Sequence, residues 1–597
     1  MFYLCLALLA TLFPWTLKAD HCPVCLAHFH GRSEAPVVVK TQCCGQRFDL
    51  DCISRCFLDQ PIGSRQCAMC RQDPMPMVNL NTSESYPDRF FPDQTFYLAC
   101  LNGDLDQVER SLAEGVNVNA IMTDDFTPLM LASIGDHEVV ERLIKAGADV
   151  NARTEDGVTS LFIASQEGNT DCVKRLINAG AEVNTHTNTG ATPLHVATLR
   201  GNTDCVKLLV KAGANLNAAS SDGVTALFIA AQENNTDCVK ILISSGADLN
   251  ANRTSDGATP LFAAAAKGNT GCIQLLTNAG AEPNARTRNG ASPLFIAALK
   301  NNTDGVKILI NAETDINPRT SDGITPLYAA AERGNTECLK LLIDAGADVN
   351  AARTADGATP LFAAAARGNA DCLKALIEAK ANINAPNKNG ATPLYIATQE
   401  GNTDCVKLLI NAGAETDAAL SDGSTPLFVA AREGNIDCLK LLINTGADIN
   451  SRIKSGATPL HAAAYKGNTD CVKLLINAGA KTDAALSDGS TPLFVAAREG
   501  NIDCLKLLIN TGADLNSRIK SAATPLHAAA YKGNTNCVKL LINAGADLNT
   551  AFPNGKTPLS IATRMGNTDC MKALIEAGAK KGTEAGKRTE ERPHSIQ

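Results

Sequence analysis

The stretch Thr392–Ser424, TPLYIATQEGNTDCVKLLINAGAETDAALSDGS, decides how this chain folds. It is 33 residues long, and near-copies of it fill most of the 597-residue sequence. The leading Thr returns in steps of 33 or 34 residues, at positions 192, 225, 259, 325, 359, 392, 425, 458, 491, 524 and 557, with a variant copy starting at Ser292. A period this regular predicts a stack of similar structural units.

Each unit is expected to form two short helices joined by a turn. Thr392 is a good helix N-cap, and Pro393 suits the first helical position because its missing N–H costs nothing there. Gly401 should end this helix, Asn402 and the residues after it can cap a second helix, and Gly413 should end the second helix. A single unit cannot cover its own apolar face, so the units must stack.

The apolar positions indicate which side of each helix is buried. On the first helix we expect a short apolar face of Leu394, Ile396 and Ala397. On the second helix we expect the buried side to contain Val406, Leu408, Leu409 and Ile410. Aromatic residues make up only 4% of the sequence, which suits thin stacked helices better than one deep core.

The motif TPLxxA followed by GNTDCVKLLIxAGA resembles the ankyrin repeat. The match recurs with the correct spacing along residues 95–581, and the first unit, from Phe96, is a divergent copy without TPL. The resemblance implies a mainly α fold, an ankyrin-repeat solenoid of about fifteen repeats. Its His residues at the TPLH position (His195, His461 and His527) are expected to be hydrogen-bonding structural residues rather than catalysts.

The 22 cysteines fall into two populations. Twelve recur at one position of the repeat, from Cys172 to Cys570, and Gly305 interrupts this ladder. Equivalent helices in neighbouring repeats should lie about 8–10 Å apart, which is too far for disulfides that need Cα atoms within about 7 Å. We therefore expect these cysteines to be small buried apolar residues. Free thiols in this number favour a reducing compartment, and hence a cytoplasmic working site.

The other cysteine population predicts a zinc-binding segment. Cys22-Pro-Val-Cys25 and Cys67-Ala-Met-Cys70 bracket Cys43-Cys44 and Cys52 within 49 residues. Two C-x-x-C pairs this close are a strong signal for zinc, because each turn offers two thiolates and a small loop-rich segment needs metal to fold.

The text CPVC–x17–CCGQRFDLDC–x14–CAMCR resembles the RING finger, in the variant with adjacent cysteines. The resemblance implies a domain at residues 19–75 that holds two Zn²⁺ ions in a cross-brace. One ion would take Cys22, Cys25 and Cys52, with Asp49 where the family has a cysteine. The other would take Cys43, Cys44, Cys67 and Cys70. Cys56, His21, His28 and His30 stay open as alternatives to Asp49.

RING domains hold a ubiquitin-charged conjugating enzyme and position its thioester for attack by a substrate lysine. The resemblance places the contacts to that enzyme at Val24, Ile53 and Arg71, and it implies no catalytic side chain. Ala68 and Cys56 depart from the family's usual Pro and Trp. Two functions therefore stay open: a RING-type E3 ubiquitin ligase, and a non-enzymatic ankyrin scaffold with a structural zinc module.

The remaining segments are short. Residues 1–18 form a hydrophobic signal or anchor segment, residues 76–94 a proline-containing linker, and residues 582–597 a basic and polar tail expected to be disordered. The apolar run at residues 2–17 is shorter than the roughly 20 residues that span a bilayer. Three interpretations stay open: a membrane tether, an export signal that sends the protein into a host cell, and a mis-assigned start.

A protein partner is expected on the concave face that ankyrin-like stacks form from their first helices and loop tips. The two residues before the first-helix terminator vary between repeats, and Tyr and Arg are common interface anchors. The candidate contacts are Arg200, Gln232, Gln399, Arg432, Tyr465, Arg498 and Tyr531. The loop-tip residues Leu420, Ile453, Leu486 and Ile519 are expected to be exposed apolar contacts.

Two functional classes are not expected. The net charge of −8 argues against a general nucleic-acid binder. No Ser/His/Asp set, phosphate-cradling glycine loop or paired acidic site stands out, which argues against a conventional small-molecule enzyme.

Overall fold

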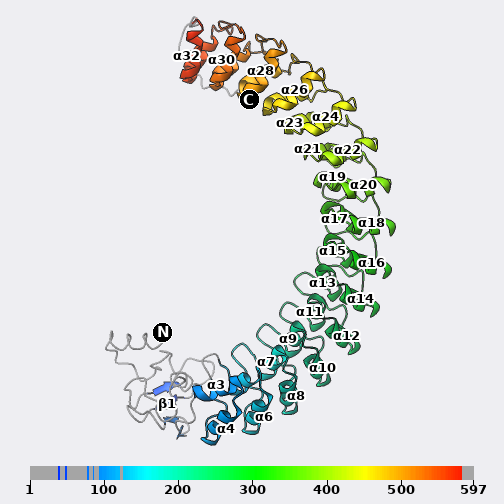
Figure 1. The fold of residues 1–597 in the computed structure, drawn as a ribbon, viewed down its shortest axis with the longest axis vertical. Coiled ribbons are helices and arrows are strands. Elements are labelled where there is room, and N and C mark those ends of the chain that lie inside the picture. Colours follow the sequence, from blue (N-terminus) through cyan, green and yellow to red (C-terminus); the bar gives the residue numbers. More distant parts are fainter. Residues whose placement is uncertain are drawn as a thin grey trace, which may run out of the picture. The chain divides into compact units, whose positions relative to one another are not determined.

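The computed structural model describes residues 93–121 and 125–580, together with the backbone of strands at residues 38–40, 47–49, 77–79 and 85–86. In these residues the chain is mainly helical. It divides into two units, Met1–Arg288 and Asn289–Gln597. Within each unit the odd-numbered helices, the first helices of their repeats, follow one another along one side (Figure 1). The even-numbered second helices follow one another along the other side, so the expected helix–turn–helix stack is confirmed.

Helices α3 to α32 form fifteen consecutive pairs in the described residues. In unit 1 the first helices are α3 (Gln94–Asn102), α5 (Pro128–Ala132), α7 (Ser160–Glu167), α9 (Pro193–Arg200), α11 (Ala226–Gln232) and α13 (Pro260–Lys267). The second helices of unit 1 are α4 (Leu105–Ala113), α6 (His137–Lys145), α8 (Thr170–Asn178), α10 (Thr203–Lys211), α12 (Thr236–Ser244) and α14 (Thr270–Asn278).

Unit 2 continues the same pattern. Its first helices are α15 (Pro293–Leu299), α17 (Pro326–Arg333), α19 (Pro360–Arg367), α21 (Pro393–Gln399), α23 (Pro426–Glu433), α25 (Pro459–Lys466), α27 (Pro492–Glu499), α29 (Pro525–Lys532) and α31 (Pro558–Met565). Its second helices are α16 (Thr303–Asn311), α18 (Thr336–Asp344), α20 (Ala370–Glu378), α22 (Thr403–Asn411), α24 (Ile436–Asn444), α26 (Thr469–Asn477), α28 (Ile502–Asn510), α30 (Thr535–Asn543) and α32 (Thr568–Glu576).

The repeat that begins at Thr392 confirms how the first helix starts and how both helices end. Thr392 Oγ1 accepts a hydrogen bond from the backbone N–H of Tyr395 at 3.2 Å, and Pro393 is the first residue of α21. Gly401 and Gly413 follow the ends of α21 and α22 with φ of 74° and 88°. Both lie in the left-handed region, where a residue with a Cβ is strained.

Asn402 is the N-cap residue of α22, as expected, but its side chain makes no cap hydrogen bond to that helix. The Asn402 amide Nδ2 instead donates to the backbone carbonyls of Ala365 and Ala366, at 2.8 and 3.2 Å, near the end of α19. A helix leaves its last carbonyls without intrahelical partners, so Asn402 caps the first helix of the preceding repeat.

The buried faces agree in part with the expectation. Val406 and Leu409 are fully buried, but Leu408 and Ile410 are only half-buried. On α21, Leu394 and Ala397 are buried as expected, whereas Tyr395 is also buried and Ile396 is half-buried. A short helix stacked between two neighbours buries its sides as well as its inner face, which the one-face interpretation did not allow for.

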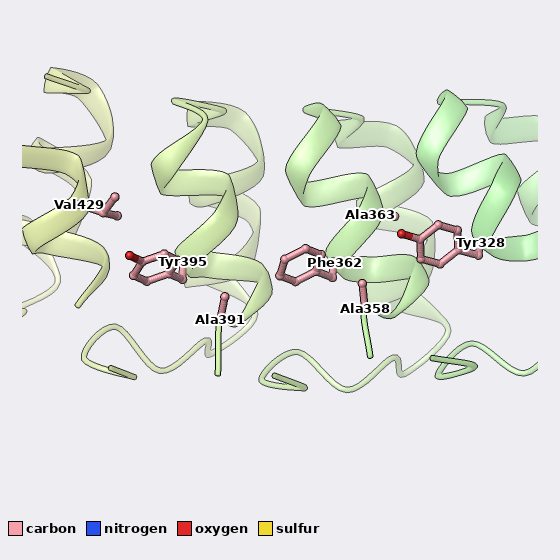
Figure 2. Packing of buried hydrophobic residues seen from close by; sticks show 7 residues of the cluster. All are labelled: Tyr328, Ala358, Phe362, Ala363, Ala391, Tyr395 and Val429. Carbon is pink, nitrogen blue, oxygen red and sulfur yellow. The ribbon is translucent and has the colours of Figure 1, made fainter. Parts of the chain in front are cut away.

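Figure 2 shows this lateral packing in unit 2. Aromatic side chains from successive first helices lie between neighbouring repeats and contact small residues there. The cluster consists of Tyr328, Ala358, Phe362, Ala363, Ala391, Tyr395 and Val429. Because each side chain packs across a repeat boundary, stability in the stack comes mainly from contacts between neighbours.

Four short strands precede the helices. They are β1 (Val38–Lys40), β2 (Arg47–Asp49), β3 (Met77–Asn79) and β4 (Ser85–Tyr86), and they form an antiparallel sheet in the order β2-β1-β3-β4. β1 pairs with β2 through Val39 and Phe48, and with β3 through Val39 and Asn79. The backbone of the expected linker at residues 76–94 therefore contributes two strands to the sheet.

The hydrophobic segment at residues 1–18 and the tail at residues 582–597 lie outside the described residues. Among the helices of the described part of the chain, none combines the length and the apolar character that crossing a membrane requires.

Candidate functional site

The seven candidate contact residues occupy equivalent positions in the fold. Each is one of the last two residues of a first helix, and each is exposed or half-buried. In unit 1 they are Arg200 on α9 and Gln232 on α11. In unit 2 they are Gln399 on α21, Arg432 on α23, Tyr465 on α25, Arg498 on α27 and Tyr531 on α29. Each unit thus presents its variable residues in a row on the first-helix side.

An asparagine follows each of these first helices in the sequence, and its side chain reaches back to the first helix of the preceding repeat. There it binds the backbone at the end of the helix. Asn468 Nδ2 donates to the carbonyl of Arg432 at 2.9 Å, and Asn501 Nδ2 donates to the carbonyl of Tyr465 at 2.9 Å. The same contact recurs from Asn534 to the carbonyl of Arg498 at 2.8 Å. The next repeat fixes the backbone carbonyl at six of the seven positions in this way, which limits the ordering cost when a partner binds, whereas beside Arg200 the asparagine bonds the carbonyl of Thr198.

We did not predict this asparagine ladder, although its signal was visible in the sequence. An Asn follows the first-helix terminator in almost every unit. A cap for its own helix could equally be Ser, Thr or Asp, so the near-invariant Asn indicates a second role. Asn302 is the exception in unit 2. Its Oδ1 accepts from the backbone N–H of Gly305, the glycine that replaces the ladder cysteine, and its buried Nδ2 has no partner among the described residues.

Two of the variable pairs are internally neutralised. Arg432 Nε donates to Glu433 Oε1 at 2.6 Å, and Arg498 Nε donates to Glu499 Oε1 at 2.7 Å. Gln399 Nε2 donates to Glu400 Oε1 at 3.2 Å, but because glutamine is uncharged this pair keeps the negative charge of Glu400. The pairs Tyr465-Lys466 and Tyr531-Lys532 have a lysine in place of the acid. Tyr465 is 49% exposed and Tyr531 is half-buried, and each ring stands beside a positive charge.

The loop tips pack against the first helices rather than extending into solvent. Leu420, Ile453, Leu486 and Ile519 are all half-buried, so their expected full exposure is wrong. Leu420 packs against the aromatic cluster that contains Tyr395, and Ile519 packs against the cluster that contains Phe494. An apolar residue at this position closes the gap between the tip and the first helix, and the sequence alone does not show that contact.

The charges of the loop tips differ between repeats. In the tip that contains Arg353, the arginine Nε donates to Asp356 Oδ1 at 2.9 Å and its guanidinium lies 5.4 Å from the ring centroid of Tyr328. Arg452 is the equivalent arginine of a later repeat, where Ser455 stands in place of that aspartate. Arg518 and Ser521 repeat this exchange two units on. In these two tips the arginine is kept, but the aspartate that would neutralise it is replaced by serine.

The histidines of the TPLH motif are structural, as expected. His461 Nδ1 accepts from the backbone N–H of Thr458 at 3.2 Å, and Nε2 lies 3.1 Å from the carbonyl of Ser490 in the next repeat. One nitrogen accepts and the other donates, which is the arrangement of a neutral imidazole. Burial lowers the pKa of His461 to about 4, so the ring stays neutral at physiological pH.

The twelve ladder cysteines are buried and free, which confirms their expected packing role. Burial raises the pKa of Cys405 and of Cys471 to about 11. The thiolate is the nucleophilic and metal-binding form, and it is scarce at these positions. The sulfur of Cys372 instead lies 3.4 Å from Thr336 Oγ1 of the preceding repeat, a contact that recurs along the ladder.

The residues of the expected zinc and conjugating-enzyme sites lie outside the described part of the chain, except for the backbone of Asp49. Cys22, Cys25, Cys43, Cys44, Cys52, Cys67 and Cys70 lie outside the described residues, as do Val24, Ile53 and Arg71. For Asp49 only the backbone, in β2, is described. In the described ranges, no three His, Cys, Asp or Glu residues gather closely enough to hold a metal ion.

Comparison with protein-family models decides the family. The model for ankyrin repeats, in three copies, matches residues 96–187, 161–253, 248–320, 313–387, 380–453, 450–519 and 517–585. This chain belongs to the ankyrin-repeat family. Among solved structures, the crystal structure of the human ASB11 ankyrin repeat domain is similar to it at 32% identity, with a TM-score of 0.35. The match covers 38% of this chain and 99% of the human one. No curated protein matches. As an ankyrin-repeat protein, the chain has a stack suited to protein–protein interaction.

Proposed function

We propose that this ankyrin-repeat protein binds a protein partner through the ends of its first helices and, through its N-terminal cysteine-rich segment, acts as a RING-type E3 ubiquitin ligase. The row of exposed, variable residues on an otherwise uniform stack carries the first half of this proposal. Their backbones are fixed by the asparagine ladder, so the side chains form a preorganised contact surface. In this proposal the stack selects the substrate and the N-terminal segment brings the conjugating enzyme.

The ligase half rests on cysteine spacing. Two C-x-x-C pairs and three of the four cysteines between them (Cys43, Cys44 and Cys52) supply seven thiolates, and Asp49 supplies the eighth ligand of two Zn²⁺ sites. Val24, Ile53 and Arg71 would contact the conjugating enzyme. The segment contributes by orienting the thioester toward a lysine of the bound partner, so it needs no catalytic side chain of its own.

A photo-crosslinking amino acid tests the partner surface even though the partner is unidentified. We expect the full chain to crosslink a discrete protein when the probe replaces Gln399 or Tyr465 on the first helices. Probes at Lys407 and Lys473, which are exposed on the second helices of the same repeats, serve as matched controls. Equal crosslinking from both sets of positions would remove the first-helix side as the binding surface.

Reconstituted ubiquitin transfer tests the ligase half. The full chain, mixed with activating and conjugating enzymes, should build ubiquitin chains and should contain two Zn²⁺ ions per chain. Arg71→Ala should abolish transfer and keep the zinc content, whereas Cys67→Ala should lower both. Transfer that survives both substitutions would overturn the assignment, and so would a chain without zinc.

A non-enzymatic adaptor is the second candidate. Ala68 and Cys56 stand where RING ligases usually have Pro and Trp, which favours a zinc module that only binds or dimerises. This candidate predicts first-helix crosslinking and two Zn²⁺ ions per chain, with no ubiquitin transfer by any conjugating enzyme.

A further inference from the structure

Unit 2 contains the same two-repeat module twice. Residues 425–448 are identical to residues 491–514, and residues 458–469 are identical to residues 524–535. We refer to residues 425–490 as the first module and to residues 491–556 as the second module. The identical residues include the ends of the first helices. The side chains at these ends in the first module therefore recur two repeats further on, in the second module.

The structure shows that the two modules are also equivalent in geometry. Arg432 and Glu433 form an ion pair with 2.6 Å between Nε and Oε1, and Arg498 and Glu499 form one with 2.7 Å. The carbonyl of Tyr465 accepts from Asn501 of the next repeat at 2.9 Å, and that of Tyr531 accepts from Asn567 of its next repeat at 3.1 Å. Two contact sites are therefore built alike within one continuous run of helices.

The exposed ends of these modules are basic although the chain as a whole is acidic. The last two positions of the first helices and the loop tips 452–456, 485–489, 518–522 and 551–555 contain eight basic and three acidic residues. The basic residues are Arg432, Arg452, Lys454, Lys466, Arg498, Arg518, Lys520 and Lys532. The acidic residues are Glu433, Asp488 and Glu499. At the helix ends alone four basic residues stand against two acidic ones, on a chain of net charge −8, and the other basic residues lie on the loop tips at the opposite end of the first helices.

Two of these acids are neutralised by ion pairs, and the third is hydrogen-bonded but keeps its charge. Glu433 and Glu499 pair with the arginines beside them. Asp488 accepts hydrogen bonds from the backbone N–H and the hydroxyl of Ser490, at 2.8 and 2.9 Å. The lysines at the helix ends and loop tips, Lys454, Lys466, Lys520 and Lys532, are exposed. Charge complementarity therefore favours an acidic partner.

The spacing of the two sites suits an extended chain. Helices α25, α27 and α29 pack in sequence, and packed helix axes lie about 8–10 Å apart, so Tyr465 and Tyr531 are about 16–20 Å apart. An extended polypeptide advances about 3.3–3.6 Å per residue, so about five or six residues join the two sites. One segment can therefore contact both tyrosines, each of which has a lysine beside it.

We propose that the two modules form a bivalent docking surface for one extended acidic polypeptide segment, which contacts Tyr465 and Lys466 at one site and Tyr531 and Lys532 at the other. This inference rests on the proposed function, because it names the class of partner for the same first-helix surface. Each site alone binds weakly, since exposed charge pairs contribute little. Joining the two sites in one ligand raises the overall affinity without any new kind of contact.

Fluorescence anisotropy of labelled poly-L-glutamate with the full chain tests this proposal. A peptide of about 15 residues spans both sites, whereas one of about 4 residues reaches at most about 14 Å and spans only one. We expect the longer peptide to bind at least about tenfold more tightly. Lys466→Glu and Lys532→Glu should each weaken the longer peptide by about 3- to 10-fold and by similar factors, and the double variant should weaken it further.

Lys473→Glu is the matched control, because it makes the same charge change on the second helix of the same repeat. Equal weakening by Lys473→Glu would show a general charge effect and overturn the proposal. So would equal affinity for the two peptide lengths, or tighter binding of a single-stranded DNA oligonucleotide of the same charge. If poly-L-glutamate does not bind while the probe at Tyr465 still crosslinks a protein, the acidic class is wrong and the proposed function stands. If crosslinking also fails, both fall.

Discussion

At the scale of single residues, the two almost identical modules differ at one loop-tip position that has a positive φ. Gly456 holds φ at 85° in the first module, and its counterpart Ala522 holds φ at 68° in the second. An L-residue in this left-handed region is strained by about 1–2 kcal/mol because its Cβ approaches the following carbonyl. The second module therefore carries a local strain that its otherwise matched copy lacks.

Ala522→Gly should relieve this strain. Part of the gain is offset because glycine has more freedom in the unfolded chain, so we expect a net stabilisation of about 0.5–1 kcal/mol. Hydrogen exchange of the amides at residues 519–526 measures the local free energy of opening. Gly456→Ala is the reciprocal control and should destabilise its own tip by a similar amount. The strain assignment is wrong if both substitutions shift exchange in the same direction.

His461 predicts a specific pH dependence. Burial lowers the pKa of His461 from 6.5 to about 4, so the unfolded chain binds more protons between these values. Stability from this residue is complete above pH 6.5 and is lost as the pH falls toward 4. The loss is on the order of 3 kcal/mol, since one pKa unit corresponds to about 1.4 kcal/mol.

Urea midpoints measured from pH 7.5 to pH 4 test this pH dependence. Among the charged groups near His461 are Arg452, which disfavours its protonation, and Asp488, which favours it. His461→Gln keeps a polar group beside Thr458 but does not titrate, so its midpoint should fall less steeply with pH. An unchanged slope in this variant would show that other groups cause the acid sensitivity.

At the scale of helices, the sequence predicted where the two helices of the repeat begin and end, but it did not predict which neighbouring repeats their side chains contact. Thr392, Pro393, Gly401 and Gly413 act within their own helices, and their roles follow from local backbone chemistry. Asn402 acts on another repeat, and a periodic sequence does not show which repeat a side chain reaches. The same holds for the half-buried loop tips, whose neighbours are defined only once the stack is built.

The asparagine ladder gives the helix-scale prediction. Asn501→Ala removes two hydrogen bonds, to the carbonyls of Ala464 and Tyr465 at 2.7 and 2.9 Å. Two lost bonds of this kind should destabilise the end of α25 by about 1–3 kcal/mol. Hydrogen exchange in residues 459–466 should rise accordingly. Asn510→Ala, at the exposed end of α28, is the matched control and should leave α25 unchanged.

At the scale of the whole molecule, the period made the stack and its buried cysteines predictable, because every unit repeats the same packing problem. The candidate contact positions were also predictable, since they are the letters that vary. The net charge that these positions present to a partner was not predictable, because it depends on which acidic side chains form ion pairs with a neighbour. Glu433 counts as a free charge in the sequence, whereas the structure pairs it with Arg432, and Asp488 keeps its charge but is hydrogen-bonded to Ser490.

The buried thiols report how the stack unfolds. In the folded chain we expect the ladder cysteines to alkylate at least about 100-fold more slowly than an exposed thiol, because burial hides them from the reagent. Stability in a repeat stack is roughly a sum over neighbouring repeats, and α32 is the last helix described. Its Ile575 is 54% exposed, whereas the equivalent Ile410 is half-buried between two repeats.

Pulsed alkylation across a urea titration, with peptide mass spectrometry, should therefore find Cys570 reactive at lower urea than Cys405. We expect this difference in reactivity because fewer described helix pairs pack against the repeat of Cys570 than against that of Cys405. In the folded chain the two side chains are equally buried, at 1% and 0% exposure. Simultaneous loss of protection at both cysteines would show that unit 2 unfolds as one cooperative body, and the nearest-neighbour description of this stack would then be wrong.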